Sequence, residues 1–102
     1  MSIHHKYGNV RTERDGQKFD SKAEARYFDQ LMLAQRAGEV AMFLRQVPFH
    51  LPGGVKYVAD FLIFHAGGTV EVVDVKGVET ESFRAKKRMV EALYPVTIEV
   101  TR

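Results

Sequence analysis

The sequence predicts a single α/β domain of the α+β type, in which helices flank a mixed central sheet and a short β-hairpin precedes it. The chain has 102 residues, which is enough for one hydrophobic core but not for two. Turn signals rich in glycine and proline divide it into segments whose apolar residues recur at strand or helix spacing. After the hairpin these segments follow the order α-β-β-β-α-β, so we expect residues 1–102 to form one domain.

The N-terminal part of the chain is expected to form an arm, a hairpin and a helix. Residues 1–9 are polar and predict a flexible arm. Residues 10–20 predict a hairpin, because an Asp-Gly dipeptide at its centre is a strong two-residue turn signal. A helix is expected over residues 22–37, with Asp20 or Ser21 as its N-cap.

The rest of the chain alternates strand and helix patterns. Gly38 stands where a glycine commonly follows the end of a helix, and Pro48 limits the pairing of the strand that contains it. Thr80 or Ser82 can open a second helix, which Pro95 ends. The expected elements are strands at residues 39–50, 55–64 and 69–76, a helix at residues 82–94 and a final strand at residues 96–102.

Composition excludes several classes of protein. The chain has no cysteine, so it has neither a disulfide framework nor a thiolate metal site. No apolar run approaches the roughly 20 residues of a membrane span, and the first residues do not resemble a signal peptide. A cytoplasmic protein without an organic cofactor is therefore expected. The formal net charge is only +2, so binding to nucleic acid must depend on where the charges lie.

Two aspartates interrupt the apolar patterns of adjacent strands. Asp60 lies in VADFLIF and Asp74 in EVVDVKG, each on a face that otherwise carries apolar residues. A three-residue loop at residues 66–68 would pair His65 with Thr69, and the same register sets Asp60 opposite Asp74. Like charges in that position repel, whereas a divalent cation between them reverses the sign of the interaction. Two carboxylates suit Mg²⁺, which prefers oxygen ligands.

A third acid and a lysine are expected at the same place. Glu24 falls on the apolar stripe of the first helix, in line with Leu31, which is unfavourable for a carboxylate unless it faces a polar site. Lys76 is one side-chain period beyond Asp74, and its amine could orient a water molecule or stabilise charge on a phosphoryl group. Each residue also has a simpler interpretation. Glu24 can act as a capping-box acid, and Asp74 with Lys76 can form an ordinary surface ion pair.

These residues resemble the motif of the PD-(D/E)XK nuclease superfamily. Asp60, thirteen intervening residues and then Asp74-Val75-Lys76 match its pattern, with Ala59 in place of the usual proline. The element order resembles the restriction-endonuclease-like core of that superfamily. More narrowly, the segments KYGN, FDSKAEA, YVADF and DVKG resemble a family of small phage and prophage proteins that includes endonuclease-like members.

The resemblance implies a metal-dependent nuclease site. Asp60 and Asp74 would bind Mg²⁺ or Mn²⁺ together with the carbonyl oxygen of Val75. Glu24 would bind the metal directly or through water, and Lys76 would assist the nucleophilic water. The implied protein is a DNA endonuclease of phage or prophage origin, and a branched or four-way-junction substrate suits so small a chain.

Contacts to nucleic acid are expected outside the acidic site. A cluster of cations lies on the second helix, although such a cluster is more often only a solvated face. The N-terminal arm adds further cations, and the resemblance implies that a glutamine on the first core strand lines the site. The residues expected to contact DNA are Arg84, Lys86, Lys87, Arg88, Gln46, Lys6 and Arg11.

Other interpretations of the same residues stay open. A homodimer would place two sites on two DNA strands. A non-catalytic nucleic-acid-binding or protein-interaction module that retains the nuclease fold is the main alternative. An RNA substrate is a third possibility, although the sequence lacks an evident aromatic stacking platform.

Overall fold

A computed structural model describes residues 12–14 and 16–102 of the chain. The proposed N-terminal arm, including Lys6 and Arg11, lies outside the described residues. The elements are β1 (Thr12–Arg14), β2 (Gln17–Phe19), α1 (Lys22–Arg36), β3 (Val40–His50), a 3-10 turn (Pro52–Gly54), β4 (Lys56–His65), β5 (Val70–Val75), α2 (Glu81–Leu93) and β6 (Ile98–Thr101).

The predicted mixed α+β fold and its element order are confirmed. Strands β3, β4, β5 and β6 form one four-stranded sheet in that order, and the short hairpin β1–β2 forms a separate sheet. The pairings β3–β4 and β4–β5 are antiparallel, whereas β5 and β6 are parallel. A crossover through α2 joins β5 to β6, as a parallel pair requires. β4 and β5 are therefore the two central strands.

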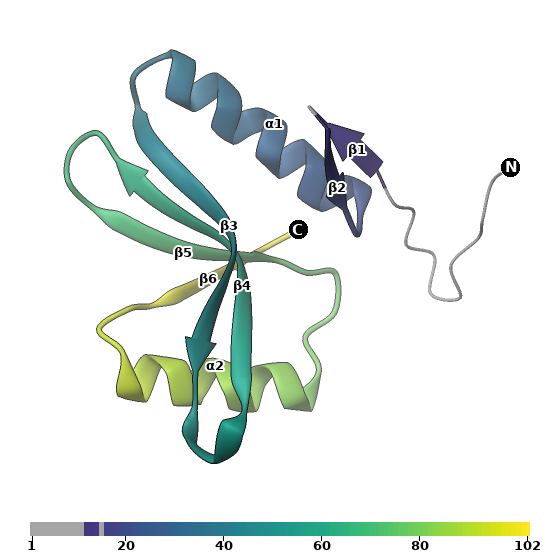
Figure 1. Ribbon diagram of the computed structural model, residues 1–102, viewed down its shortest axis with the longest axis vertical. Coiled ribbons are helices and arrows are strands. Elements are labelled where there is room, and N and C mark those ends of the chain that lie inside the picture. The colour runs from purple at the N-terminus through teal and green to yellow at the C-terminus, as the bar shows by residue number, and fades with distance from the viewer. Residues whose placement is uncertain (1–11, 15) are drawn as a thin grey trace, which may run out of the picture.

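The two helices cover opposite faces of the sheet (Figure 1). Val72 and Val73 are neighbours on β5 and so point to opposite faces. Val73 packs in the cluster that contains residues of α1, and Val72 packs in the cluster that contains residues of α2. The β1–β2 hairpin lies beside the N-terminal end of α1 (Figure 1).

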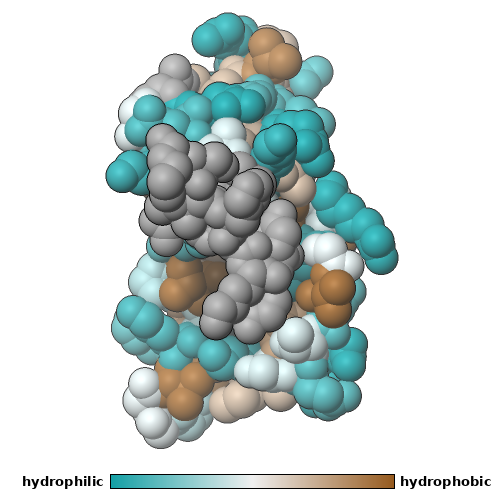
Figure 2. Space-filling view, turned by 90° about the vertical axis from the view of Figure 1, so that its right-hand side faces the viewer, coloured by the Kyte–Doolittle hydropathy of each residue, from teal (hydrophilic) through white to brown (hydrophobic). Residues whose placement is uncertain are grey.

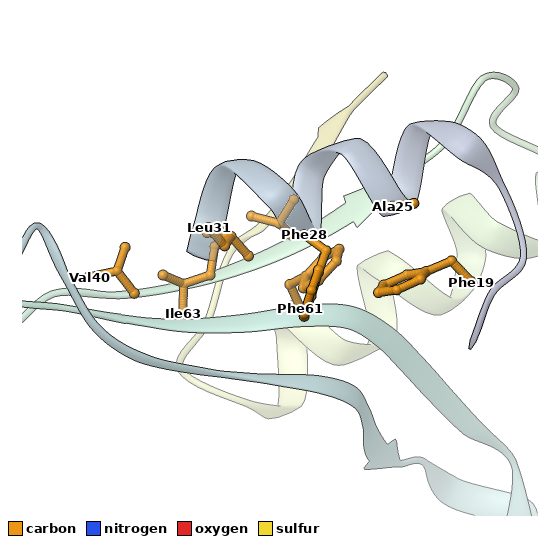
Figure 3. Packing of buried hydrophobic residues seen from close by; sticks show 8 residues of the cluster. Phe19, Ala25, Phe28, Leu31, Val40, Phe61 and Ile63 are labelled. Atoms are coloured by element: carbon orange, nitrogen blue, oxygen red, sulfur yellow. The ribbon is translucent and has the colours of Figure 1, made fainter. Parts of the chain in front are cut away.

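The core under α1 is built mainly from aromatic rings. Phe28 and Leu31 of α1 point toward Phe61 and Ile63 of β4, with Phe19 of the hairpin at one end of the row (Figure 3). The Phe19 and Phe28 ring centroids are 5.0 Å apart in a tilted arrangement. Such pairs add to the stabilisation from burial alone, so the hairpin is attached to the core through one of its own side chains.

Local signals in the sequence account for the helix ends. The Ser21 hydroxyl accepts a hydrogen bond from the Glu24 N–H at 3.1 Å and caps α1. Thr80 caps α2 in the same way, accepting from the Phe83 N–H at 3.1 Å. Gly38 has a φ of 81°, the left-handed conformation in which glycine ends helices without steric cost.

The surface is mostly hydrophilic on the face seen in Figure 2, where hydrophobic residues form small separate patches. Among the described residues, no helix is long and apolar enough to cross a membrane. Pro48 lies on β3, which, within the part of the chain that the structure describes, pairs only with β4. An edge strand tolerates proline because its free side needs no N–H donor, so Pro48 is compatible with the full length of β3.

Candidate active site

The register of the β4–β5 hairpin brings Asp60 and Asp74 together as the sequence predicts. The His65 N–H donates to the Thr69 carbonyl at 2.9 Å, which closes the expected loop. The backbone ladder runs down to the pair Phe61–Val73, and the next position in the same register is Asp60 opposite Asp74.

Side-chain hydrogen bonds replace the backbone ladder at this point. The Asp60 N–H donates to Oδ1 of Asp74 at 3.1 Å, and the Val75 N–H donates to Oδ2 of Asp60 at 2.9 Å. Each aspartate thus bonds to the backbone of the opposite strand. A carboxylate that accepts N–H bonds is fixed in direction, so the two acids are held facing each other at the end of the ladder.

Asp74 is among the most buried side chains of the protein. Its exposed fraction is 1%, and its Oδ2 accepts a hydrogen bond from the Tyr57 hydroxyl. Burial, followed by the hydrogen bond and the negative charge of Asp74, raises the pKa of Tyr57. Tyr57 therefore remains a donor at any ordinary pH, which helps to offset the cost of burying the carboxyl group.

The backbone of β3 is unusual opposite Asp60. The ladder pairs Arg45 with Phe61 and Val47 with Ala59, which leaves Gln46 opposite Asp60. Gln46 has a φ of 55°, a left-handed conformation that non-glycine residues rarely adopt. Its side-chain amide donates to Oε2 of Glu24 at 3.2 Å and to Oδ1 of Asp60 at 3.4 Å. The Gln46 amide thus joins the acid of α1 to the acid of β4.

The buried side chains of β4 change from one hydrophobic cluster to the other at Asp60. Tyr57 and Ala59 pack in the cluster that contains α2, whereas Phe61 and Ile63 pack in the cluster that contains α1. A regular strand would keep these four positions on one face. The regular alternation expected along this strand is therefore broken at Asp60.

Glu24 is 5% exposed and faces the acidic site from α1. Its Oε2 accepts from a guanidinium nitrogen of Arg45 at 3.2 Å and from the Gln46 amide. Of the two bonds of a capping box, only the one from the Glu24 N–H to the Ser21 hydroxyl forms. The Glu24 carboxylate is directed instead to Arg45 and Gln46 of β3. Burial raises the pKa of Glu24, while Arg45 acts in the opposite direction and Asp74 adds to the increase.

The pKa of Asp60 is raised to about 7, from an ordinary value of 3.8. Burial is the largest cause, and the Val75 N–H bond opposes it. The negative charges of Asp74 and Glu24 raise the pKa further, as does hydrogen bonding between the Asp60 and Asp74 carboxyl groups. The three acids are therefore close enough to influence one another electrostatically.

Lys76 contacts an aromatic ring on α2 rather than one of the acids. Its amine lies over the ring of Phe83 on α2, 4.7 Å from the ring centroid, in a cation–π contact. Among the described residues, the ion pairs do not include one between Lys76 and an acid of this site. Phe83 packs in the same cluster as Val72, so Lys76 keeps the side of the sheet that strand alternation from Val72 predicts, and only the expected contact with an acid is missing.

The donor chemistry fits a hard divalent cation, but the present arrangement is not a closed metal site. Within residues 12–14 and 16–102, no group of three or more histidine, cysteine, aspartate or glutamate side chains is placed to hold a metal ion. Asp60 and Asp74 supply two facing carboxylates, and the Gln46 amide occupies the position between Asp60 and Glu24. Magnesium and manganese binding remains a prediction.

The cationic side chains of α2 differ in whether they are already bonded within the chain. Arg84 bonds to the Glu79 carbonyl and the Glu81 carboxylate, and Lys87 pairs with Glu91 at 3.2 Å. Lys86 is half-buried and Arg88 is exposed. The four residues thus lie on one helix as expected, with two of them engaged within it.

The sequence did not single out Arg45 and Tyr57. Arg45 precedes Gln46 on a strand, so regular alternation places it on the opposite face from any residue that Gln46 contacts. Only the left-handed conformation at Gln46 brings both side chains to Glu24, and nothing in the sequence signals that conformation. Tyr57 lies three residues before Asp60, and a tyrosine hydroxyl on a buried strand was a usable signal, because it needs a partner.

The fold and this cluster define a mixed α/β domain in which a half-buried acid of β4 faces a buried acid of β5, the two central strands of its sheet. The chain belongs to the family described as "Protein of unknown function (DUF1064)", whose family model matches residues 4–101. The comparisons gave no significant match among curated proteins or among solved structures.

Proposed function

We propose that this protein is a divalent-metal-dependent endonuclease that hydrolyses phosphodiester bonds in DNA. The observation that carries the proposal is the convergence of the Asp60 and Asp74 carboxyl groups between central strands, with the pKa of Asp60 raised to about 7. Facing carboxylates repel, so an arrangement that holds them together is a suitable place for a cation.

Three acids of the chain would hold the ion. Asp60 and Asp74 would bind it through carboxylate oxygens, and Glu24 would complete the set after its carboxylate leaves the Gln46 amide. A bound Mg²⁺ or Mn²⁺ supplies positive charge for the scissile phosphate and acidity for a nearby water molecule. The carbonyl oxygen of Val75 is a further candidate ligand, because the Lys76 N–H in the same peptide unit donates to the Thr101 carbonyl at 2.8 Å and fixes that peptide.

The remaining roles belong to neighbouring side chains. Tyr57 holds Asp74 in one orientation through its hydroxyl, and the Val75 N–H does the same for Asp60. Lys76 follows the last residue of β5, and its flexible side chain can leave the ring of Phe83 when a phosphate approaches. The amine would then lie near the reacting phosphate and help to orient the attacking water.

The test is a cleavage assay on linear duplex, single-stranded and four-way-junction DNA, with and without Mg²⁺ or Mn²⁺. Asp74→Asn keeps the shape of the side chain, since its oxygen can still accept from Asp60 and its amide can face Tyr57. We expect this variant and Lys76→Ala to lose cleavage by about 100-fold or more while still binding DNA. Asp29→Asn is the matched control, because it changes a carboxylate in a surface pair with Arg14 and should cut normally.

Melting temperatures establish that the variants are folded. In the absence of metal, Asp74→Asn should still melt in one cooperative transition, because the removal of repulsion between Asp60 and Asp74 opposes the loss of the acceptor for the Tyr57 hydroxyl. The proposal fails if the wild-type protein cuts none of these substrates in either metal.

A non-catalytic nucleic-acid-binding module is the second candidate. The observation in its favour is that the acids already have partners within the chain, since Glu24 pairs with Arg45 and Asp74 bonds to Tyr57. A buried polar network of this kind can serve structure alone. The module predicts DNA binding by the wild-type protein without cleavage, and the same binding by Asp74→Asn and Lys76→Ala.

A further inference from the structure

Arg45 connects three separate elements at the edge of the acidic site. Its guanidinium donates to the Gln17 side chain at 2.9 Å and to the Lys18 carbonyl at 3.1 Å, both on β2. It also pairs with the Glu24 carboxylate of α1 at 3.2 Å, from its own position on β3. The Arg45 side chain is only 16% exposed, and its bond to Glu24 is partly buried, whereas the two bonds to β2 lie at the surface.

The guanidinium is also fixed in its plane. It lies over the ring of Phe19, 3.8 Å from the ring centroid, which leaves it little freedom to rotate. Its Nε is buried and has no hydrogen-bond partner among the described residues. An unpaired buried N–H is costly. The bonds to the acceptors on Gln17, Lys18 and Glu24 offset that cost and therefore determine where the guanidinium lies.

Arg45 and Gln46 bond to the same atom, Oε2 of Glu24. Consecutive side chains of a regular strand point to opposite faces, so this is possible only because Gln46 has a φ of 55°. Two donors on one carboxylate oxygen fix the direction of the Glu24 carboxyl group. A lysine could supply the charge but not the planar fork that reaches β2 and α1 together.

We propose that Arg45 is a positioning residue, which fixes the Glu24 carboxylate toward Gln46 and Asp60 and fastens the β1–β2 hairpin beside the site. Its effect on cleavage rests on the proposed nuclease function, whereas its effect on the orientation of Glu24 does not. Groups that orient a ligand without touching the substrate typically change activity by about 10- to 100-fold.

Arg14 provides a matched control. Its Nε pairs with Asp29 of α1 at 3.1 Å, so it also fastens the hairpin to α1, but its hydrogen bonds and ion pair go to Glu13 and Asp29 and not to Glu24. If Arg45 only holds the hairpin, Arg45→Met and Arg14→Met should behave alike. If Arg45 positions Glu24, the two variants should differ at the site.

Two measurements separate these outcomes. The first is the NMR signal of the Gln46 side-chain amide, which reports on its bonds to Glu24 and Asp60 whether or not the protein cuts DNA. The second is kcat and KM for cleavage in Mg²⁺. Arg45→Lys accompanies Arg45→Met, because the lysine variant keeps the positive charge and should fold even if the methionine variant does not.

In both Arg45 variants, we expect the Gln46 amide signal to move toward that of a free amide. We expect kcat to fall about 10- to 100-fold with KM for DNA within about twofold, and Arg14→Met to leave both readouts near wild type. An unchanged Gln46 signal in Arg45→Lys overturns the inference, whatever the activity. A shifted Gln46 signal in a protein that never cuts DNA supports the positioning role and rejects the nuclease.

Discussion

At the scale of single residues, the protonation of Asp60 links the site to the stability of the fold. The pKa of Asp60 is raised to about 7 when folded, against an ordinary value of 3.8. Between these values the folded state binds a proton that the unfolded state has released, so the free energy of unfolding decreases as pH rises. The stabilisation is complete below pH 3.8 and is lost as pH rises through about 7.

We expect the metal-free protein to lose stability over this pH range by at least about 1 kcal/mol on account of Asp60, which corresponds to about 4–8 °C in Tm. In Asp60→Asn that contribution should be absent. The measurement is Tm against pH for both proteins in the presence of a chelator. Parallel profiles for the two proteins would contradict a raised pKa at Asp60.

The sequence was sufficient to predict the pairing of Asp60 with Asp74 but not their environment. The pairing follows from the loop length and the two-residue period of strands, both of which are local properties. The bonds of Gln46 and Arg45 to Glu24 depend on a single backbone angle in β3, and glutamine gives no local reason to adopt it. The contact of the Lys76 amine with the ring of Phe83 likewise depends on how α2 packs against the sheet.

At the scale of the elements, the boundaries were predicted to within about two residues, because they depend on local chemistry. Ser21 and Thr80 cap the helices through their own side chains, and Gly38 and Pro95 mark the ends. The hydrogen bonds and ion pairs of the α2 side chains were harder to predict. Its amphipathic pattern indicates which side is buried, but not which cations bond within the helix.

The exposed face of α2 leads to a prediction about nucleic acid. Arg84 and Lys87 have acidic partners on α2, whereas Arg88 is exposed and has no ion-pair partner among the described residues. If α2 lies along the phosphate backbone, Arg88→Ala should weaken binding to all DNA sequences about equally. The slope of log K against log salt concentration should decrease by about 0.9, the value for one lost phosphate contact.

Arg36→Ala is the control for this experiment, because Arg36 is an exposed cation at the end of the other helix. Binding is measured in chelator at several salt concentrations, so that cleavage does not interfere. Equal slopes for the wild-type protein and Arg88→Ala would mean that Arg88 does not contact a phosphate and that the DNA lies on another surface.

At the scale of the whole molecule, one sheet is shared by two hydrophobic clusters. Phe61 and Val73 belong to the cluster under α1, and Ala59 and Val72, on the same two strands, belong to the cluster under α2. Loss of either cluster exposes a face of the central strands. We therefore expect the domain to unfold as one cooperative unit.

Phe61→Ala tests this expectation. Phe61 is fully buried and lies within 5.2 Å of Tyr27 and 6.2 Å of Phe43, measured between ring centroids. Its truncation should cost about 3–5 kcal/mol, while Leu33→Ala, at a residue that is 62% exposed, should change stability by no more than about 0.5 kcal/mol.

Urea denaturation followed by far-UV circular dichroism and by tyrosine fluorescence provides the measurement. The two probes should give coincident transitions in the wild-type protein and in Phe61→Ala. Separate transitions would mean that the region around α1 and the region around α2 unfold independently.

The parallel pairing of β5 with β6 has a consequence for biosynthesis. Asp74 and Val75 lie beside Val100 and Thr101, so one side of the strand that carries Asp74 stays open until residues 98–101 have left the ribosome. The hairpin that sets Asp60 against Asp74 is local and can form earlier, whereas this last pairing spans more than twenty residues. During translation, the nascent chain would thus carry two facing acids on an unfinished sheet, and the site would become rigid only when β6 docks.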